Sequence, residues 1–297
     1  MQESFGKRIW RLIYPMLTYM AVLRFVEFMA LSLISMTYMM NNKNFTVRIS
    51  PEVQSELEKI YSEYINEINI AAFICVIPLL ILFMYLDRKR MAQAGKSEAH
   101  EKTSLYKYIF VPVLGALCCV AWTFMIIMGG FKLNGMNNYP DVFFCGKTVI
   151  ELIALGILSP AANELLLRGV LYNRLKENTS VMLSALMISF FSMFSAYSIP
   201  EAVYLFIMSL LSVYLYERYH SIIAPVLLNI GAAVIAVLER EEKVLSTLYS
   251  SWSTFLISTI GFVVLTILLL CLIEKLVLNK QEKDPFEIKI DIDMNIM

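Results

Sequence analysis

Glu164 and Arg168 are the two residues whose types and spacing most favour a chemical site. They lie four residues apart in an apolar segment, so a helix would place both side chains on one face, with the acid on the favoured N-terminal side. Charges at membrane depth are costly, and an ionisable pair there is by default a site hypothesis. Glu164 could act as a general base toward water. The pair could equally be structural, and spacing alone leaves both interpretations open.

A second group of polar residues, small and neutral, follows in the next apolar segments. Ser195 and Asn229 join Asn163, the neighbour of Glu164, as side chains that can hydrogen-bond between helices inside a membrane. They can serve as glue for a helical bundle, or they can line a polar cleft. Ser195 has no histidine or lysine base near it in the sequence, which disfavours a serine nucleophile.

These residues resemble the motifs of the CPBP family, which comprises CAAX-type prenyl-protein endopeptidases and bacteriocin-processing or immunity (Abi) proteins. The first family motif is two adjacent glutamates, three residues and Arg-Gly, often after a proline. It is followed by a Phe-x-x-x-His helix and an Ala-Pro-x-x-x-His-x-x-x-Asn helix. The residues that carry the resemblance, within about 148–238, are Pro160, Asn163, Glu164, Arg168, Gly169, Phe191, Ser195, Ala224, Pro225, Asn229 and Ala233.

The departures from this pattern fall on the reactive positions. Asn163 stands where the family has its catalytic glutamate, and Ser195 and Asn229 stand where it has histidines. Ala233 replaces the closing asparagine, and Phe190 would shift the second motif to Phe194. The resemblance therefore implies a catalytic set of Glu164, Asn163, Ser195 and Asn229, mostly degenerate, and a binding set of Arg168, Phe191 and Ala233.

Glu164 is a weak substitute for the missing base. It is adjacent to Asn163, so its side chain points about 100° away around the helix axis. Arg168, one turn later, would hold it ionised, whereas a general base works best when it accepts a proton readily.

Metal and cofactor chemistry is disfavoured by the histidine count. The chain has two histidines, His100 and His220, both in predicted polar connections, and a zinc site needs about three protein ligands. The resemblance brings a metal requirement for some relatives, but we predict no metal and no cofactor here. Five cysteines without a Cys-x-x-Cys spacing disfavour a disulfide framework. Zero net charge gives no indication of nucleic-acid binding.

The elements that position these residues are predicted to be membrane helices. Hydrophobic residues make up 58% of the 297, against about 45–50% in soluble domains. Apolar runs of about 20 residues recur, each long enough to span a bilayer. We predict an all-α integral membrane protein, a polytopic bundle of about eight transmembrane helices. The predicted spans are residues 9–40, 70–86, 108–129, 148–175, 181–197, 200–216, 221–238 and 252–278.

Three regions are expected along the chain. Residues 1–147 would hold N-terminal helices and a basic loop, 148–238 the family-like core, and 239–297 a last helix and a tail. Acidic residues in 41–69 indicate a short amphipathic surface helix. Arg24 and Glu27, one turn apart in the first span, can pair with each other or face the bundle and meet the helix that carries Glu164, and we favour the first alternative. The bias of lysine and arginine predicts cytoplasmic termini, and the resemblance implies a multi-pass protein of a prokaryotic cell membrane.

Three functions from different classes fit these observations. The first is a non-catalytic relative that binds a peptide, a lipidated peptide or a membrane-protein partner, possibly in bacteriocin immunity or regulation. The second is an active CAAX-type intramembrane endopeptidase that uses Glu164. The third is a small transporter component, although no inverted repeat is evident. The lipid bilayer is the one partner common to all three.

Overall fold

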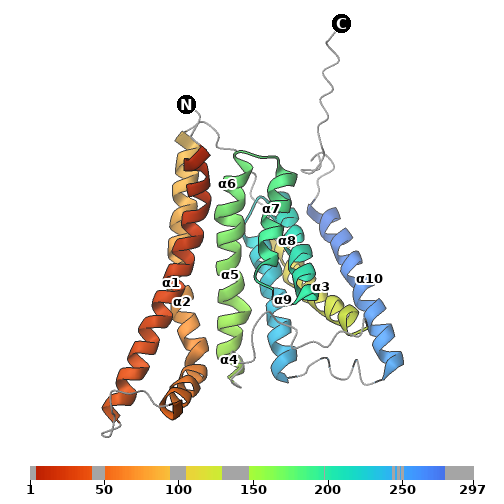
Figure 1. Cartoon of the computed structure of the whole chain (residues 1–297). Coiled ribbons are helices and arrows are strands. Elements are labelled where there is room, and N and C mark those ends of the chain that lie inside the picture. The colour runs from red at the N-terminus through yellow and green to blue at the C-terminus, as the bar shows by residue number, and fades with distance from the viewer. Residues whose placement is uncertain are drawn as a thin grey trace.

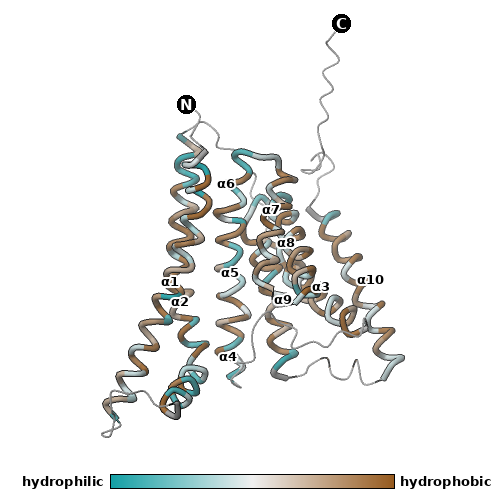
Figure 2. The backbone as a smooth tube through the Cα atoms, in the orientation of Figure 1, coloured by the Kyte–Doolittle hydropathy of each residue, from teal (hydrophilic) through white to brown (hydrophobic). Residues whose placement is uncertain are grey.

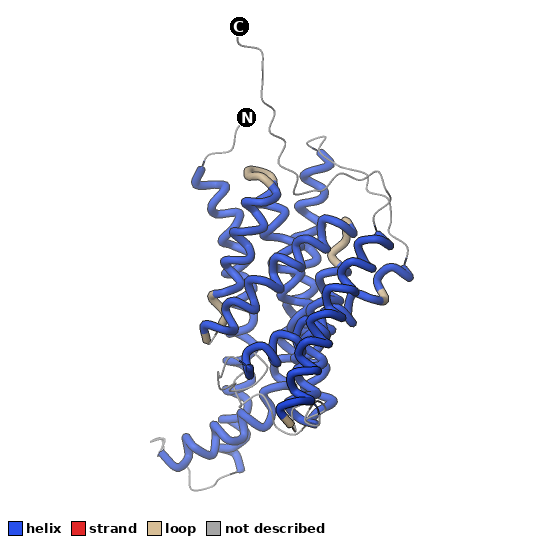
Figure 3. The backbone as a smooth tube through the Cα atoms, turned by 90° about the vertical axis from the view of Figure 1, so that its right-hand side faces the viewer, coloured by secondary structure: helices blue, strands red, loops and turns tan. Residues whose placement is uncertain are grey.

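The computed structural model describes residues 5–41, 51–93, 105–128, 147–196, 198–242, 245, 248 and 251–277. Within these ranges every regular element is a helix, and no strand occurs (Figure 3). The predicted all-α fold class is therefore confirmed. His100, Cys145, and most of the basic loop and the loop before residue 147 lie outside the described residues.

The helices follow one another along a polytopic bundle (Figure 1). Seven described helices are long and apolar enough to cross a membrane, and each falls on a predicted span. The elements, in chain order, are α1 (Phe5–Asn41), α2 (Pro51–Gln93), η1 (Leu105–Tyr108), α3 (Phe110–Met128), α4 (Thr148–Glu151), η3 (Leu152–Leu158), α5 (Ser159–Glu164), η4 (Leu165–Tyr172), α6 (Asn173–Lys176), α7 (Val181–Met193), α8 (Ile199–Tyr219), α9 (Ile223–Glu242) and α10 (Trp252–Val277).

The predicted span 181–197 is too long, because α7 ends at Met193 after 13 residues. A helix of that length reaches about 20 Å, against a hydrocarbon core of about 30 Å. Serines explain the early end. Ser195 Oγ donates to the Ser192 carbonyl, and Ser198 caps α8. Because Lys176 beside the start of α7 pairs with Glu217 near the end of α8, the two helices form a hairpin that returns to the same end of the bundle.

The predicted surface helix in residues 41–69 is not a separate element. Residues 51–69 form the first part of α2, which runs on without a break to Gln93. Its inner face is buried at Ile65, Asn66 and Ile68, because it packs against the helix that begins at Thr148. The charged outer face remains, but the segment belongs to the bundle.

Residues 148–176 form one continuous helix, which we call the motif helix, built from α4, η3, α5, η4 and α6. The stretches on either side of α5 are π-helical, so each of their turns holds one more residue than an α-turn. Pro160 lies inside this continuous helix, at the junction of η3 and α5, where its missing N–H removes one backbone hydrogen bond. π-Helical turns are frequent at functional sites, and here they bracket Asn163 and Glu164.

Two buried apolar clusters flank this helix. One joins α2, α5, η4, α7 and α8 around Leu80, Tyr172 and Ile188, and the other joins α3, α8, α9 and α10 around Leu114 and Leu228. The α3–α9 crossing is very close. A Cβ on Gly115 would lie 1.8 Å from the Leu228 carbonyl oxygen, and one on Gly231 would lie 1.9 Å from that of Pro112. Only glycine fits at these two positions, and their contact places α9 directly against α3.

The helix ends carry the polar groups. Hydrophobic colouring dominates the middle of the helices, while hydrophilic colouring gathers toward their ends (Figure 2). α1 begins and α10 ends at the same end of the bundle (Figure 1). There Arg11, Tyr14, Asp87, Arg174 and Glu177 form what we call the end cluster, which ties α1 and α2 to α6.

The Arg24–Glu27 pair is confirmed. Arg24 Nη1 lies 2.7 Å from Glu27 Oε2 within α1. The two charges thus neutralise each other on one helix, and the expected alternative, a contact with the helix that carries Glu164, does not form.

Candidate functional site

A cavity of about 280 Å³ lies between α5, η4, α7, α8 and α9, with one residue from α3. All seven residues that the sequence singled out line it, although they come from three separate helical segments and one turn. The complete lining is Cys119, Pro160, Asn163, Glu164, Leu166, Leu167, Arg168, Phe191, Ser192, Ser195, Tyr204, Leu205, Met208, Ser209, Asn229, Ala232, Ala233 and Ala236.

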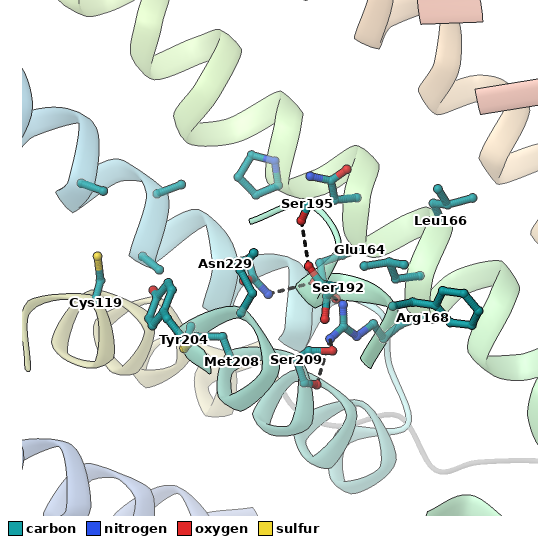
Figure 4. A pocket seen from close by; sticks show the side chains of 18 residues that line it. Cys119, Glu164, Leu166, Arg168, Ser192, Ser195, Tyr204, Met208, Ser209 and Asn229 are labelled. Atoms are coloured by element: carbon teal, nitrogen blue, oxygen red, sulfur yellow. Dashed lines mark hydrogen bonds and ion pairs between the residues drawn. The ribbon is translucent and has the colours of Figure 1, made fainter. Parts of the chain in front are cut away.

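Glu164 is the centre of the site. Its Oε1 accepts hydrogen bonds from Arg168 Nη1 at 2.8 Å and from Asn229 Nδ2 at 2.9 Å. Figure 4 shows Glu164 between these two side chains. The residue is 3% exposed, so the carboxyl group is held almost entirely by protein groups. The predicted pairing of Glu164 with Arg168 is therefore present, and α9 contributes a second donor that the spacing did not indicate.

Arg168 connects the motif helix to α8. Its Nη2 donates to the Ser209 carbonyl at 2.8 Å and to Ser209 Oγ at 2.6 Å. At 1% exposure it is among the most deeply buried side chains in the described chain. The guanidinium and the carboxylate together make a buried pair without net charge, which is the form in which charges are tolerated at membrane depth.

Asn229 connects α9 to Glu164 and to α8. Besides Glu164, its Nδ2 lies 2.8 Å from Ser212 Oγ and 3.1 Å from the Pro225 carbonyl. Pro225 and Asn229 are four residues apart in α9, so the side-chain amide of Asn229 lies next to the backbone carbonyl of Pro225 one turn earlier. We call Glu164, Arg168, Ser209, Ser212 and Asn229 the cavity cluster.

Asn163 and Ser195 line the same cavity but lie outside this hydrogen-bond network. Asn163 Oδ1 accepts from Tyr19 of α1 at 3.0 Å, and its side chain is exposed. Ser195 Oγ donates to the Ser192 carbonyl at 2.8 Å. Of the four positions that correspond to family catalytic residues, only Glu164 and Asn229 are in direct contact. The expected divergence of Asn163 and Glu164 is present, since one side chain is exposed and the other buried.

The cavity includes the residues of only one of the two registers of the second motif. Phe191 and Ser195 line it, whereas Phe190 and Phe194 do not and are largely exposed. The cavity therefore favours the register on Phe191 and Ser195, and the correspondence to the family motif stays a prediction.

Two atoms of the cavity cluster have no hydrogen-bond partner in the described part of the chain. They are Glu164 Oε2 and Arg168 Nε, both buried. A buried acceptor without a partner is costly, and it is expected to find a bound molecule or water. Ala232, Ala233 and Ala236 form one side of the same cavity, so a polar region adjoins an apolar, small-residue wall.

Sequence reasoning missed Ser209, Ser212 and Tyr19. The two serines lie three residues apart in an apolar helix, a spacing that places both on one face and that marks polar contacts between membrane helices. The sequence therefore contained a pattern from which the two serines could have been predicted. The role of Tyr19 had no local signal, because it depends on how α1 lies against α5.

The residues around the cavity do not fit a metal ion. Among the described residues, no three histidine, cysteine or acidic side chains come together. The cavity lining includes one carboxylate, which Arg168 and Asn229 already engage, and no histidine. His220 stands apart, at the left-handed C-terminal end of α8. We derive no step through a metal here.

The comparisons with known proteins place this site in context. Residues 146–235 match the family model described as type II CAAX prenyl endopeptidase Rce1-like. This range begins at the start of the motif helix and ends within α9, so it contains all seven predicted site residues. No curated protein and no solved structure matched the chain.

Proposed function

We propose that the chain is a non-catalytic member of the family of type II CAAX prenyl endopeptidases, whose model matches residues 146–235. In this proposal it is a multi-pass membrane protein that binds a peptide or lipidated peptide in the family's cavity without hydrolysing it. One observation carries the proposal. The carboxylate that lines the cavity is engaged on Oε1 by Arg168 and Asn229 together.

Hydrolysis needs a group that takes a proton from water and donors that stabilise the oxyanion. Asn163 and Ser195 offer neutral side chains at the positions where the family has a glutamate and a histidine. Asn229 could donate to an oxyanion, but its Nδ2 is occupied by Glu164, Ser212 and the Pro225 carbonyl. The cavity keeps groups that can hold a ligand and lacks a pair of groups that can transfer protons.

Binding without cleavage suits a regulator of a membrane partner or an immunity protein against a secreted peptide. Glu164 Oε2 would accept a hydrogen bond from a ligand amide. The alanine wall of α9 would contact an apolar side chain or lipid tail. We further propose that the membrane is a prokaryotic cell membrane, as the family resemblance implies, and that both ends of the chain face the cytoplasm. α1 begins and α10 ends at one end of the bundle, and the basic residues Arg88, Lys89 and Arg90 near the end of α2 lie at that same end (Figure 1).

The test uses the full-length protein in lipid vesicles and a fluorescent, farnesylated peptide as probe. We expect saturable binding and no cleavage product by mass spectrometry. Ala233→Leu, which narrows the cavity, should weaken binding at least tenfold, whereas Leu265→Ala on the exposed face of α10 should leave it unchanged. A cleavage product that disappears in Glu164→Ala would refute the proposal.

A second function, an active endopeptidase, is favoured by the free Oε2 atom of Glu164 beside the cavity. In that reaction Oε2 would accept a proton from a water that attacks the peptide carbonyl, and Asn229 would donate to the oxyanion. Glu164 would then give the proton to the leaving amine as the C–N bond breaks. Glu164→Gln should then abolish cleavage and Asn163→Ala should preserve it. Loss in both variants, or in neither, would count against this function.

A further inference from the structure

The first helix carries an ion pair in an unusual place. α1 contacts mainly α2, and none of its most apolar window is buried. Arg24 lies within this helix with 77% of its side chain exposed, next to Glu27 at 25%. Charged residues within membrane helices almost always face other protein groups or a cavity. Arg24 instead faces outward from the described chain.

The depth of Arg24 follows from the end cluster. Arg11 pairs with Glu177, the residue directly after the motif helix, so Arg11 marks that end of the membrane-spanning region. Arg24 lies 13 residues further along α1, which is about 20 Å deeper. The hydrocarbon core is about 30 Å thick, so the guanidinium lies inside it.

The surface around Arg24 has the pattern of a helix-packing seam. Leu17, Met20, Phe28 and Leu31 are 51%, 56%, 65% and 40% exposed. Together with Arg24 they recur every three or four residues, which aligns them along one stripe of the helix. Glu27 lies at the edge of this stripe. A helix packed here would contact large apolar side chains and, midway along the stripe, one positive and one negative group.

We propose that this stripe of α1 is the interface with a second copy of the chain, in which Arg24 of each copy pairs with Glu27 of the other. This inference is independent of the function proposed for the cavity. Membrane topology gives every copy the same orientation, so two α1 helices meet in parallel with their ion pairs at the same depth. A two-fold axis between them makes the contact self-complementary. A partner helix with a single carboxylate would satisfy Arg24 but would place a like charge near Glu27.

The decisive experiment separates the contact between chains from the pair within one chain. Arg24→Glu gives a chain with two acidic groups in the stripe, and Glu27→Arg gives one with two basic groups. Each should self-associate about tenfold more weakly than the natural chain, because the opposite-charge contacts are replaced by like charges. A mixture of the two variants should restore association, since opposite charges then meet across the interface. No pairing within a chain can produce that rescue.

Association is measured by photobleaching steps of singly labelled full-length protein in vesicles of increasing dilution, and by co-purification of two differently tagged copies. Single-step bleaching of the natural chain at every density would overturn the proposal, as would folded variants whose mixture fails to recover. If a charge variant does not insert, Phe28→Ala provides the same test without a charge change. It should weaken association, and Leu265→Ala on α10 should not; equal effects of the two would also overturn it.

Discussion

The end cluster and the cavity cluster are each built around an arginine from the same helix, and they differ in what they leave open. Arg168 and Arg174 have equally buried side chains, each 2% exposed. Arg174 uses all three nitrogens. Nε binds Asp87 at 2.7 Å, Nη1 binds the Arg11 carbonyl, and Nη2 binds Tyr14 at 2.7 Å, whose ring it also covers. Arg168 leaves Nε without a partner, beside a carboxylate with one free oxygen.

This difference separates a structural tie from a binding site. In the end cluster all three nitrogens of Arg174 are bonded to protein groups. The cluster helps to position three helices, and its arginine has no nitrogen left to donate to a ligand. An incompletely satisfied network beside a cavity retains hydrogen-bonding capacity that a ligand can use. Burial and charge do not distinguish the two clusters, because both contain buried ion pairs. The difference lies in whether every donor and acceptor has a hydrogen-bond partner.

The largest effect is expected from Arg168→Met. The change leaves Glu164 buried without its counter-charge, which should lower the free energy of unfolding by about 3–5 kcal/mol. The double variant Glu164→Gln and Arg168→Met removes both charges and should regain most of that loss while it abolishes ligand binding. Reversible unfolding in mixed detergent measures the first quantity and probe binding the second. A double variant no more stable than Arg168→Met would show that the cavity cluster is not a coupled pair.

Removal of the arginine from the end cluster should have a smaller effect on stability and none on ligand affinity. Arg174→Leu loses the contacts to Asp87 and Tyr14, and we expect a cost of about 3 kcal/mol, because Asp87 keeps some exposure to solvent. Lys89→Ala, at an exposed position of the same end, serves as control. A change in ligand affinity in the folded Arg174→Leu protein would contradict the division between the two clusters.

The α3–α9 crossing tests whether the cavity depends on distant backbone contacts. Gly115→Ala would press a methyl group against the Leu228 carbonyl, and overpacking of this kind costs about 1–3 kcal/mol. Asn229, one residue along α9, should move with it, so probe binding should weaken as well. Gly261→Ala on α10 meets no atom within 4 Å and should be tolerated. Equal tolerance at both glycines would mean that the helices do not approach this closely.

The smallest expected effect belongs to Ser212→Ala. It deletes one hydrogen bond to Asn229, a change of about 0.6 kcal/mol between membrane helices. The amide of Asn229 keeps Glu164 as a partner, so ligand affinity should shift about twofold or less, a 1.4 kcal/mol change being tenfold. A large loss of binding with unchanged stability would instead place Ser212 in the ligand contact.

Hydropathy located the long helices because the need for about 20 apolar residues is local in sequence, but it missed the polar first part of α2. The last span, predicted at 252–278, is Trp252–Val277. Hydropathy did not predict the end of α7, because that end depends on hydrogen bonds of Ser195 and Ser198 and not on apolar side chains. The family resemblance led to residues that share one cavity. It could not show that Arg168 reaches Ser209 or that Tyr19 reaches Asn163, because these contacts depend on how α8 and α1 are rotated against the motif helix.

The π-helical stretches around α5 make this helix sensitive to its own length. Glu164 and Arg174 belong to different clusters, and the eight residues of η4 between them determine how far one is turned from the other. Loss of a single residue there would rotate the two sites relative to each other and shorten their separation along the helix axis. Arg174 would leave Asp87, or Glu164 would leave Asn229. An insertion or deletion anywhere in η4 should therefore separate the two clusters, even where a substitution that keeps the number of residues, at a position other than Arg168, would be tolerated.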